Sequence, residues 1–183
     1  MKKKILCAAV LLPFALAAFA GPFGLEMGMT LKQVEQACGG RKAVHIGDIR
    51  YYIKPEKTHP SFSEYIAWIS PTEGLCFIRA NSEEIYLDPT VVTVRNVFYR
   101  AEGALSKSYG KSILTDELPS WTASLYGLQS GTSRLDAHWF PNRSDVVWIY
   151  LYVDAIDLDT AIISVYYEFA NYKKVEAAQD GVL

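Results

Sequence analysis

Residues 147–154 read Val-Trp-Ile-Tyr-Leu-Tyr-Val-Asp, a stretch in which aliphatic and aromatic side chains alternate. Because successive side chains of a β-strand point to opposite faces of the sheet, this alternation predicts a strand with one aliphatic and one aromatic face. The aliphatic face carries Val147, Ile149, Leu151 and Val153, and the opposite face carries Trp148, Tyr150, Tyr152 and Asp154. We therefore expect a sheet whose two faces differ in chemical character.

Five further segments have strand character. Each alternates in the same way or is rich in aromatic and β-branched residues, and turn-forming residues separate them. They cover residues 49–54, 62–69, 75–80, 134–139 and 161–169. Together with 147–154 they predict six strands, three in each half of the chain.

Two helices are predicted ahead of these groups of strands. Thr30 and Gln33 form the Thr-x-x-Gln pattern of a capping box, and glycines 39–40 end the helix that follows. Apolar residues keep helical spacing over 94–109, and Gly110 supplies a stop. We expect one helix to precede each group of three strands.

A shorter helix, capped by Ser120, is predicted to run to about Leu128, and a polar tail is predicted from Asn171. Helices grouped before strands favour an α+β fold with an antiparallel sheet, because a parallel sheet needs strands and helices in alternation. We therefore expect a single α+β domain over 21–183, an antiparallel sheet packed with helices. The order of elements also suggests two tandem helix-plus-three-strand units, at 24–88 and 90–171.

The first 20 residues have the composition of a cleavable secretory signal. Three lysines at 2–4 precede the apolar stretch 5–18, and Ala18-Phe19-Ala20 has the small-x-small form of a signal peptidase site. The apolar stretch contains Pro13 and is shorter than the roughly 20 residues that span a membrane. We expect residues 1–20 to be removed, no stable membrane or lipid anchor, and a periplasmic or secreted product.

The charge of the expected mature chain argues against nucleic acid as a partner. Three of the 18 Lys and Arg residues lie in 1–20 and none of the 20 Asp and Glu residues do, so residues 21–183 carry a net charge of −5. No cluster of Lys and Arg remains to follow a phosphate backbone or an anionic membrane surface.

Two cysteines remain after cleavage, Cys38 and Cys76. In an oxidising compartment an even pair predicts a disulfide, and we expect Cys38 and Cys76 to be bridged. The alternative is two separate buried thiols, because Cys76 lies inside the apolar run 75–78 and free cysteine is often buried.

Aromatic residues are the feature that most favours binding. The chain has 12 Tyr and 4 Trp, and Trp148, Tyr150, Tyr152 and Tyr166 are expected to share one face of the sheet. These residue types dominate binding hot spots, so we expect the four to anchor a partner. Two other arrangements remain open: helices on both faces of the sheet, or helices on the aromatic face itself.

Catalytic and metal-binding patterns are weaker. The three histidines, at 45, 59 and 138, are far apart, and none has a second ligand at helical or strand spacing, so we expect no metal site and no cofactor. Glu64 and Glu168 stand in apolar strands and are the first carboxylates to check for a raised pKa. We expect both on a solvated face and assign no catalytic residue.

Two sets of short motifs and the order of the predicted elements resemble known families. Gly28-Met29-Thr30, Val34 and Gly39-Gly40 resemble the helix-entry motif of SmpA/OmlA-type periplasmic proteins, which implies helices on a three-stranded sheet. The tandem order is similar to that of the β-lactamase inhibitor protein, which implies binding across an aromatic-rich face. Phe23-Gly24-Leu25, Gly74-Leu75-Cys76 and the run 167–171 look like an uncharacterised family of small secreted bacterial proteins, which implies export.

These observations lead to one functional expectation with two alternatives. We expect a non-enzymatic, inhibitor- or assembly-factor-like module that binds another envelope or secreted protein through its sheet face. The alternatives are a cell-envelope hydrolase with paired carboxylates and a carrier of apolar small molecules or lipids. A deep cleft with converging acidic groups favours the hydrolase, an apolar cavity between sheet and helices favours the carrier, and a shallow aromatic surface favours binding.

Overall fold

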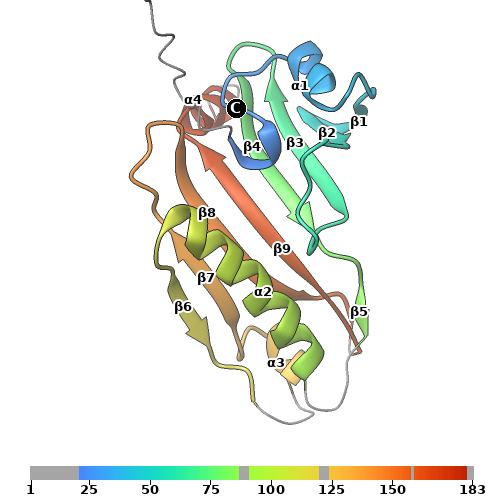
Figure 1. Cartoon of the computed structure of the whole chain (residues 1–183), viewed down its shortest axis with the longest axis vertical. Coiled ribbons are helices and arrows are strands. Elements are labelled where there is room, and N and C mark those ends of the chain that lie inside the picture. Colours follow the sequence, from blue (N-terminus) through green and yellow to red (C-terminus); the bar gives the residue numbers. More distant parts are fainter. Residues whose placement is uncertain (1–20, 87–90, 120–123, 158, 181–183) are drawn as a thin grey trace, which may run out of the picture.

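The computed structural model describes residues 21–86, 91–119, 124–157 and 159–180. These residues form one open sheet of nine antiparallel strands, four α-helices and a short 3-10 helix (Figure 1). Eight strands lie side by side in the order β1-β2-β3-β4-β9-β8-β7-β6, and β5 pairs with β9. The predicted α+β fold with an antiparallel sheet is confirmed.

The first half of the chain supplies the four neighbouring strands at one end of the strand order. Its elements are η1 (Pro22–Gly24), α1 (Leu31–Ala37), β1 (Val44–Gly47), β2 (Arg50–Ile53), β3 (Glu64–Ser70) and β4 (Gly74–Asn81). The capping box of α1 is present as predicted. The backbone N–H of Thr30 donates to Gln33 Oε1 at 2.8 Å, and the N–H of Gln33 donates to Thr30 Oγ1 at 3.4 Å.

The second half supplies the strands at the other end of the strand order, together with β5. Its elements are β5 (Ile85–Tyr86), α2 (Val92–Tyr109), β6 (Ile113–Asp116), α3 (Ser124–Gln129), β7 (Leu135–Trp139), β8 (Val146–Ala155), β9 (Thr160–Phe169) and α4 (Tyr172–Asp180). The pairing of β4 with β9 joins the two halves into one sheet. The suggested division into units 24–88 and 90–171 stays a prediction.

Helix α2 covers the aliphatic face of the sheet over β8 and β9 (Figure 1). Its buried residues are Val94, Phe98, Ala101 and Leu105, one stripe at helical spacing. They belong to the same core as Ile149, Leu151 and Val165 of the sheet. The central strands are therefore fixed by apolar packing on this side. No helix of the described residues has the length and apolar character needed to cross a membrane.

Four elements differ from the sequence-based expectation. The segment from Asn171 is not a polar tail but helix α4, because Val175 is buried against the sheet and Tyr172 packs beside it. Strands β1, β5 and β6 were not predicted; each has only two to four residues. The proposed cap Ser120 and neighbouring Trp121 lie outside the described residues.

The predicted disulfide is not formed: Cys38 and Cys76 are both buried free thiols. Strand β4 has a bulge at Cys76, because Trp68 pairs with Phe77 whereas the next residue, Ile69, pairs with Leu75. Cys38 belongs to the main core, whereas Cys76 belongs to a separate cluster with Phe77 and Val175. The bulge thus turns Cys76 away from the core that holds Cys38.

Candidate functional site

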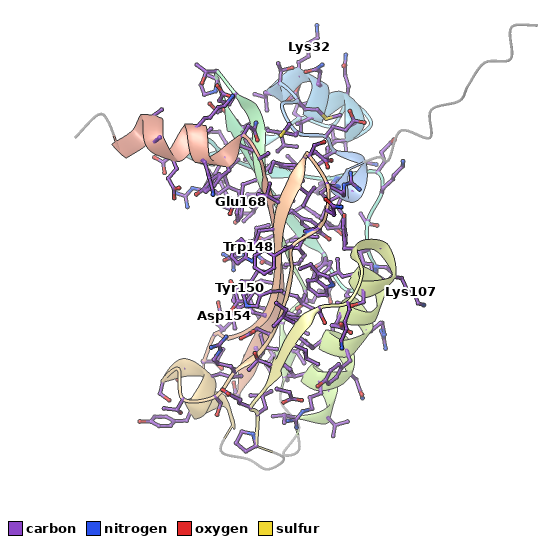
Figure 2. All side chains as sticks on the ribbon, turned by 90° about the vertical axis from the view of Figure 1, so that its left-hand side faces the viewer. Lys32, Lys107, Trp148, Tyr150, Asp154 and Glu168 are labelled. Carbon is purple, nitrogen blue, oxygen red and sulfur yellow. The ribbon has the colours of Figure 1, made fainter. Side chains whose placement is uncertain are left out.

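The four predicted aromatic residues lie on the sheet face opposite α2. Trp148, Tyr150 and Tyr152 alternate along β8 with buried core residues, and Tyr166 is the direct partner of Tyr150 on β9. All four side chains are partly exposed. Figure 2 shows Trp148 and Tyr150 on this side of the sheet, between α4 at one end and α3 at the other, with α2 on the far side.

Strand register brings further side chains into line with these four. Seven directly paired residues from seven strands form one row across the face: Tyr52, Ile66, Arg79, Tyr166, Tyr150, His138 and Ile113. Arg79 and His138 therefore flank the predicted aromatic residues on either side. We call Trp148, Tyr150, Tyr152, Tyr166, Arg79 and His138 the aromatic face.

The rings of β8 stack on one another. Trp148 and Tyr150 are 5.4 Å apart between ring centroids, Tyr150 and Tyr152 are 4.9 Å apart, and both pairs are within 10° of parallel. The imidazole of His138 stacks on Tyr150 at 4.4 Å. Because neighbouring rings cover much of each other's faces, the stack presents mainly ring edges and hydroxyl groups to a partner.

Two hydrogen bonds fix these rings across strands. The indole N–H of Trp148 donates to Nδ1 of His138 at 3.2 Å, and the hydroxyls of Tyr152 and Tyr166 share a hydrogen bond of 2.6 Å. Burial, with a smaller effect of the bond to Tyr166, raises the pKa of Tyr152 well above its usual range. Burial also raises the pKa of Tyr150. Both hydroxyls therefore stay protonated and can donate hydrogen bonds at neutral pH.

Arg79 places a positive charge beside the tyrosines. Its Nε donates to Asn81 Oδ1 at 2.8 Å, its Nη2 donates to Ser164 Oγ at 3.4 Å, and its guanidinium lies 5.5 Å from the ring centroid of Tyr166. All of these partners are neutral, and within the described part of the chain no carboxylate lies within 4.0 Å of Arg79. The aromatic face thus holds a partly exposed cation without an acidic partner.

Asp136 supports the edge of the face beside His138. Its side chain is 3% exposed, and Oδ2 accepts a hydrogen bond from Nε of Arg134 at 2.9 Å. Oδ1 lies 3.4 Å from Nε2 of His138 but accepts no hydrogen bond from the described protein atoms. Since Nδ1 of His138 accepts from Trp148, Nε2 carries the proton that faces Asp136 when the ring is neutral. This arrangement orients the imidazole within the stack.

Glu64 and Glu168 do not form an acid–base pair. Glu64 on β3 pairs with Asn81 on β4, and Asn81 pairs with Ser164 on β9. Glu168 lies four residues farther along β9 than Ser164. Four residues of antiparallel strand span about 13 Å, beyond the separations of about 5 to 9.5 Å typical of glycosidase carboxylates. Glu64 accepts a hydrogen bond from Asn81. Burial raises the pKa of Glu168, and Glu176 adds to this shift whereas Lys173 opposes it.

Five surface hollows in the described region lie outside the aromatic face. Their volumes are about 270 to 620 Å³, and they are lined by residues that do not belong to that face. The described residues contain no group of three or more His, Cys, Asp or Glu side chains arranged to hold a metal ion. The row of directly paired residues spans seven strands of an open sheet, an extended surface suited to contact with another surface.

Sequence reasoning identified the four aromatic residues but missed Arg79 and His138. Both alternate with buried residues in their strands, at positions 78–80 and 137–139. That pattern shows that each side chain lies on the face opposite the core. Which strands neighbour β8 and β9 depends on long-range pairing, and the pairing of β4 with β9 has no local signal.

No protein-family model, curated protein or solved structure matches this chain. The resemblances seen in short stretches of the sequence therefore stay predictions.

Proposed function

We propose that this chain is an exported, non-enzymatic module that binds another envelope or secreted protein through the aromatic face. The observation that carries the proposal is the stack of Trp148, Tyr150 and Tyr152 on a sheet face that α2 leaves uncovered. Trp, Tyr and Arg are the residues most enriched at binding hot spots, and this face combines all three. Its rings are held by cross-strand hydrogen bonds, so their side chains lose little conformational freedom on binding.

The chemistry of the face favours a partner rich in hydrogen-bond acceptors, with an acidic side chain opposite Arg79. Ring edges carry partial positive charge, tyrosine hydroxyls donate, and among the described residues no carboxylate lies within 4.0 Å of the Arg79 guanidinium. A carboxylate of the partner would meet a charge-assisted donor at the middle of the row. This assignment distinguishes a protein surface from a glycan, since a sugar ring packs on an open aromatic face and the faces here are largely covered by neighbouring rings.

The hydrolase and carrier alternatives find less support. Glu64 and Glu168 lie too far apart along the sheet to act together on one bond. A carrier needs an apolar cavity between sheet and helices. Under the middle of α2 that space holds buried side chains, and the hollow of about 580 Å³ that is lined by residues of η1, α2 and β9 also has Lys57, Lys107 and Arg143 in its lining. Binding of another protein through the aromatic face is the function that the geometry supports best.

Site-specific photo-cross-linking tests this proposal. Tyr150 is replaced by p-benzoylphenylalanine in the full chain, expressed with its own first 20 residues, and the envelope fraction is irradiated. The matched control carries the same group at Tyr126, which is 70% exposed on α3 and outside the aromatic face. We expect one discrete protein adduct from position 150, none from position 126, and a cross-linked peptide that contains Asp or Glu.

Three outcomes contradict the proposal. Equal adducts from both positions would mean non-specific contact. An adduct with a glycan or a lipid would mean that the ligand of this face is not a protein. Persistence of the adduct when Trp148→Ala or Arg79→Gln is added means that the partner does not depend on this face.

A further inference from the structure

Strand β6 is a free edge of the sheet. It is the outermost strand beside β7, and Figure 1 shows no described element beyond it. The backbone N–H of Glu117 donates to the carbonyl of Arg134 at 2.8 Å, which continues the ladder with β7 by one residue. Because inward and outward backbone groups alternate in an antiparallel ladder, the N–H and C=O groups of Leu114 and Asp116 point outward.

Large apolar side chains are concentrated along this edge. Ile113 is 63% exposed and Leu114 is 44% exposed on β6 itself, and Phe140, which directly follows β7, is 67% exposed. Tyr99 of α2 is 39% exposed and donates its hydroxyl hydrogen bond to Asp116 at 2.6 Å. An outward row of backbone groups with exposed apolar neighbours is a template for another strand.

The opposite edge is protected, whereas β6 is not. Strand β1 shifts register between His45 and Gly47, and such a bulge disrupts further pairing. Strand β6 pairs with β7 over Ile113–Asp116 without any shift and contains no proline. Among the described strands, β5 also pairs on one side only but has just two residues, so β6 is the longer regular edge for an added strand.

Charge along β6 indicates that the added strand is a second copy of this chain. Lys111 lies just before β6, whereas Asp116 and Glu117 lie at its end. An antiparallel copy brings Lys111 of one chain diagonally next to Glu117 of the other, and a two-fold axis makes this contact twice. A parallel copy would place like charges together.

We propose that two copies pair through β6 in an antiparallel arrangement with the two-fold axis at Thr115. In this register Leu114 of each chain exchanges backbone hydrogen bonds with Asp116 of the other, and the two Thr115 residues face each other in a non-hydrogen-bonded pair. The axis is perpendicular to the sheet, so the two sheets become one and both aromatic faces lie on the same side. This surface is distinct from the aromatic face, and neither proposal depends on the other.

Sedimentation equilibrium and directed cross-linking test the pairing. Purified chain 21–183 is expected to form a concentration-dependent dimer, and Leu114→Pro removes one outward N–H per copy, which raises the dimer dissociation constant by about tenfold or more. In a separate variant, Thr115→Cys, the two Cα atoms of the pair are expected about 4.5 Å apart, within disulfide reach, so mild oxidation gives a covalent dimer. Val44→Cys on β1, 60% exposed, is the matched control and stays monomeric on a non-reducing gel.

A monomeric wild-type chain at all concentrations overturns the proposal. A dimer that does not cross-link through Thr115→Cys also overturns it, because another surface or register then holds the copies together. The cross-linking variant keeps the test decisive if Leu114→Pro fails to fold, since Thr115→Cys changes only a partly exposed side chain.

Discussion

The hydroxyls of Tyr152 and Tyr166 share a 2.6 Å hydrogen bond that links β8 to β9 diagonally, because Tyr166 pairs directly with Tyr150 and not with Tyr152. The centroids of the two rings lie 5.2 Å apart and their planes are at 58°, so the Tyr166 ring is tilted against the Tyr152 end of the stack of parallel rings. Burial of Tyr152 and its hydrogen bond to Tyr166 both raise the pKa of the Tyr152 hydroxyl.

Tyr152 makes stability depend on alkaline pH. Burial and the bond to Tyr166 raise its pKa above the unfolded value of about 10, so its contribution is fully present below pH 10 and is lost as the pH rises further. We expect the free energy of unfolding to fall above pH 10, with at most about 1.4 kcal/mol per pH unit from this one group. Urea unfolding from pH 8 to 11.5 measures the slope.

Tyr152→Phe should flatten that slope, whereas Tyr126→Phe, on an exposed ring, should leave it as in the wild type. Identical slopes in all three proteins would show that the Tyr152 hydroxyl has no part in the pH dependence.

Thiol counting tests the state of the cysteines. Burial raises the pKa of Cys76 to about 11 and also raises the pKa of Cys38, so neither thiol should react with Ellman's reagent in the folded chain 21–183. Unfolded in guanidinium without reductant, the same protein should release two thiols per chain. A count of zero would mean that the bridge forms after all.

Gly74 is expected to be intolerant of a side chain. It has φ +68°, and a Cβ atom there would collide with the backbone of Gly28, whose N–H donates to the carbonyl of Leu75 at 2.9 Å. Gly74→Ala should lower the free energy of unfolding by more than about 2 kcal/mol, because strained backbone and a backbone clash add.

The matched control for Gly74→Ala is Gly103→Ala in α2, where a Cβ would meet no atom within 4 Å. It should stabilise the fold by about 0.5 to 1 kcal/mol, the ordinary gain of Ala over Gly in a helix. Equal effects of the two substitutions in urea unfolding would contradict the packing described around Gly28.

Removal of the first 20 residues is tested by the mass of the exported chain. Protein isolated from the envelope of expressing cells should begin at Gly21, because Ala18 and Ala20 fit the small-residue positions of a signal peptidase site. Intact-mass measurement distinguishes this chain from one that still begins at Met1. A retained first residue in the envelope fraction would contradict cleavage.

The alternation over 147–154 was enough to place Trp148, Tyr150 and Tyr152 on the face opposite the aliphatic core, and Tyr166 joins them through the pairing of β9 with β8. It was not enough to decide which face a helix covers, because both faces of that strand are apolar. In the structure helices lie on both sides: α2 covers the aliphatic side with its stripe of Val94, Phe98 and Leu105, and α4 and α3 lie at the two ends of the aromatic side, with Trp148 and Tyr150 between them.

Other features had no local signal. Helix α4 is polar in composition, and its contacts with the sheet are few, chiefly those of Val175 and Tyr172 near Phe77. Its sequence therefore predicted a polar tail. The bulge at Cys76 depends on pairing with β3 and turns a plausible disulfide partner to another cluster. Arg79 joins the aromatic face only through the pairing of β4 with β9.

The most direct test of the aromatic face is an equilibrium titration with the partner identified by cross-linking. Trp148→Ala and Tyr150→Ala should each weaken binding by about 2 kcal/mol or more, roughly thirtyfold in Kd, as expected for hot-spot aromatics. Tyr126→Ala and Tyr86→Ala, at side chains 70% and 72% exposed elsewhere, should leave Kd within about twofold. Unchanged affinity of the Trp148 and Tyr150 variants, with their fold intact by circular dichroism, would contradict the account.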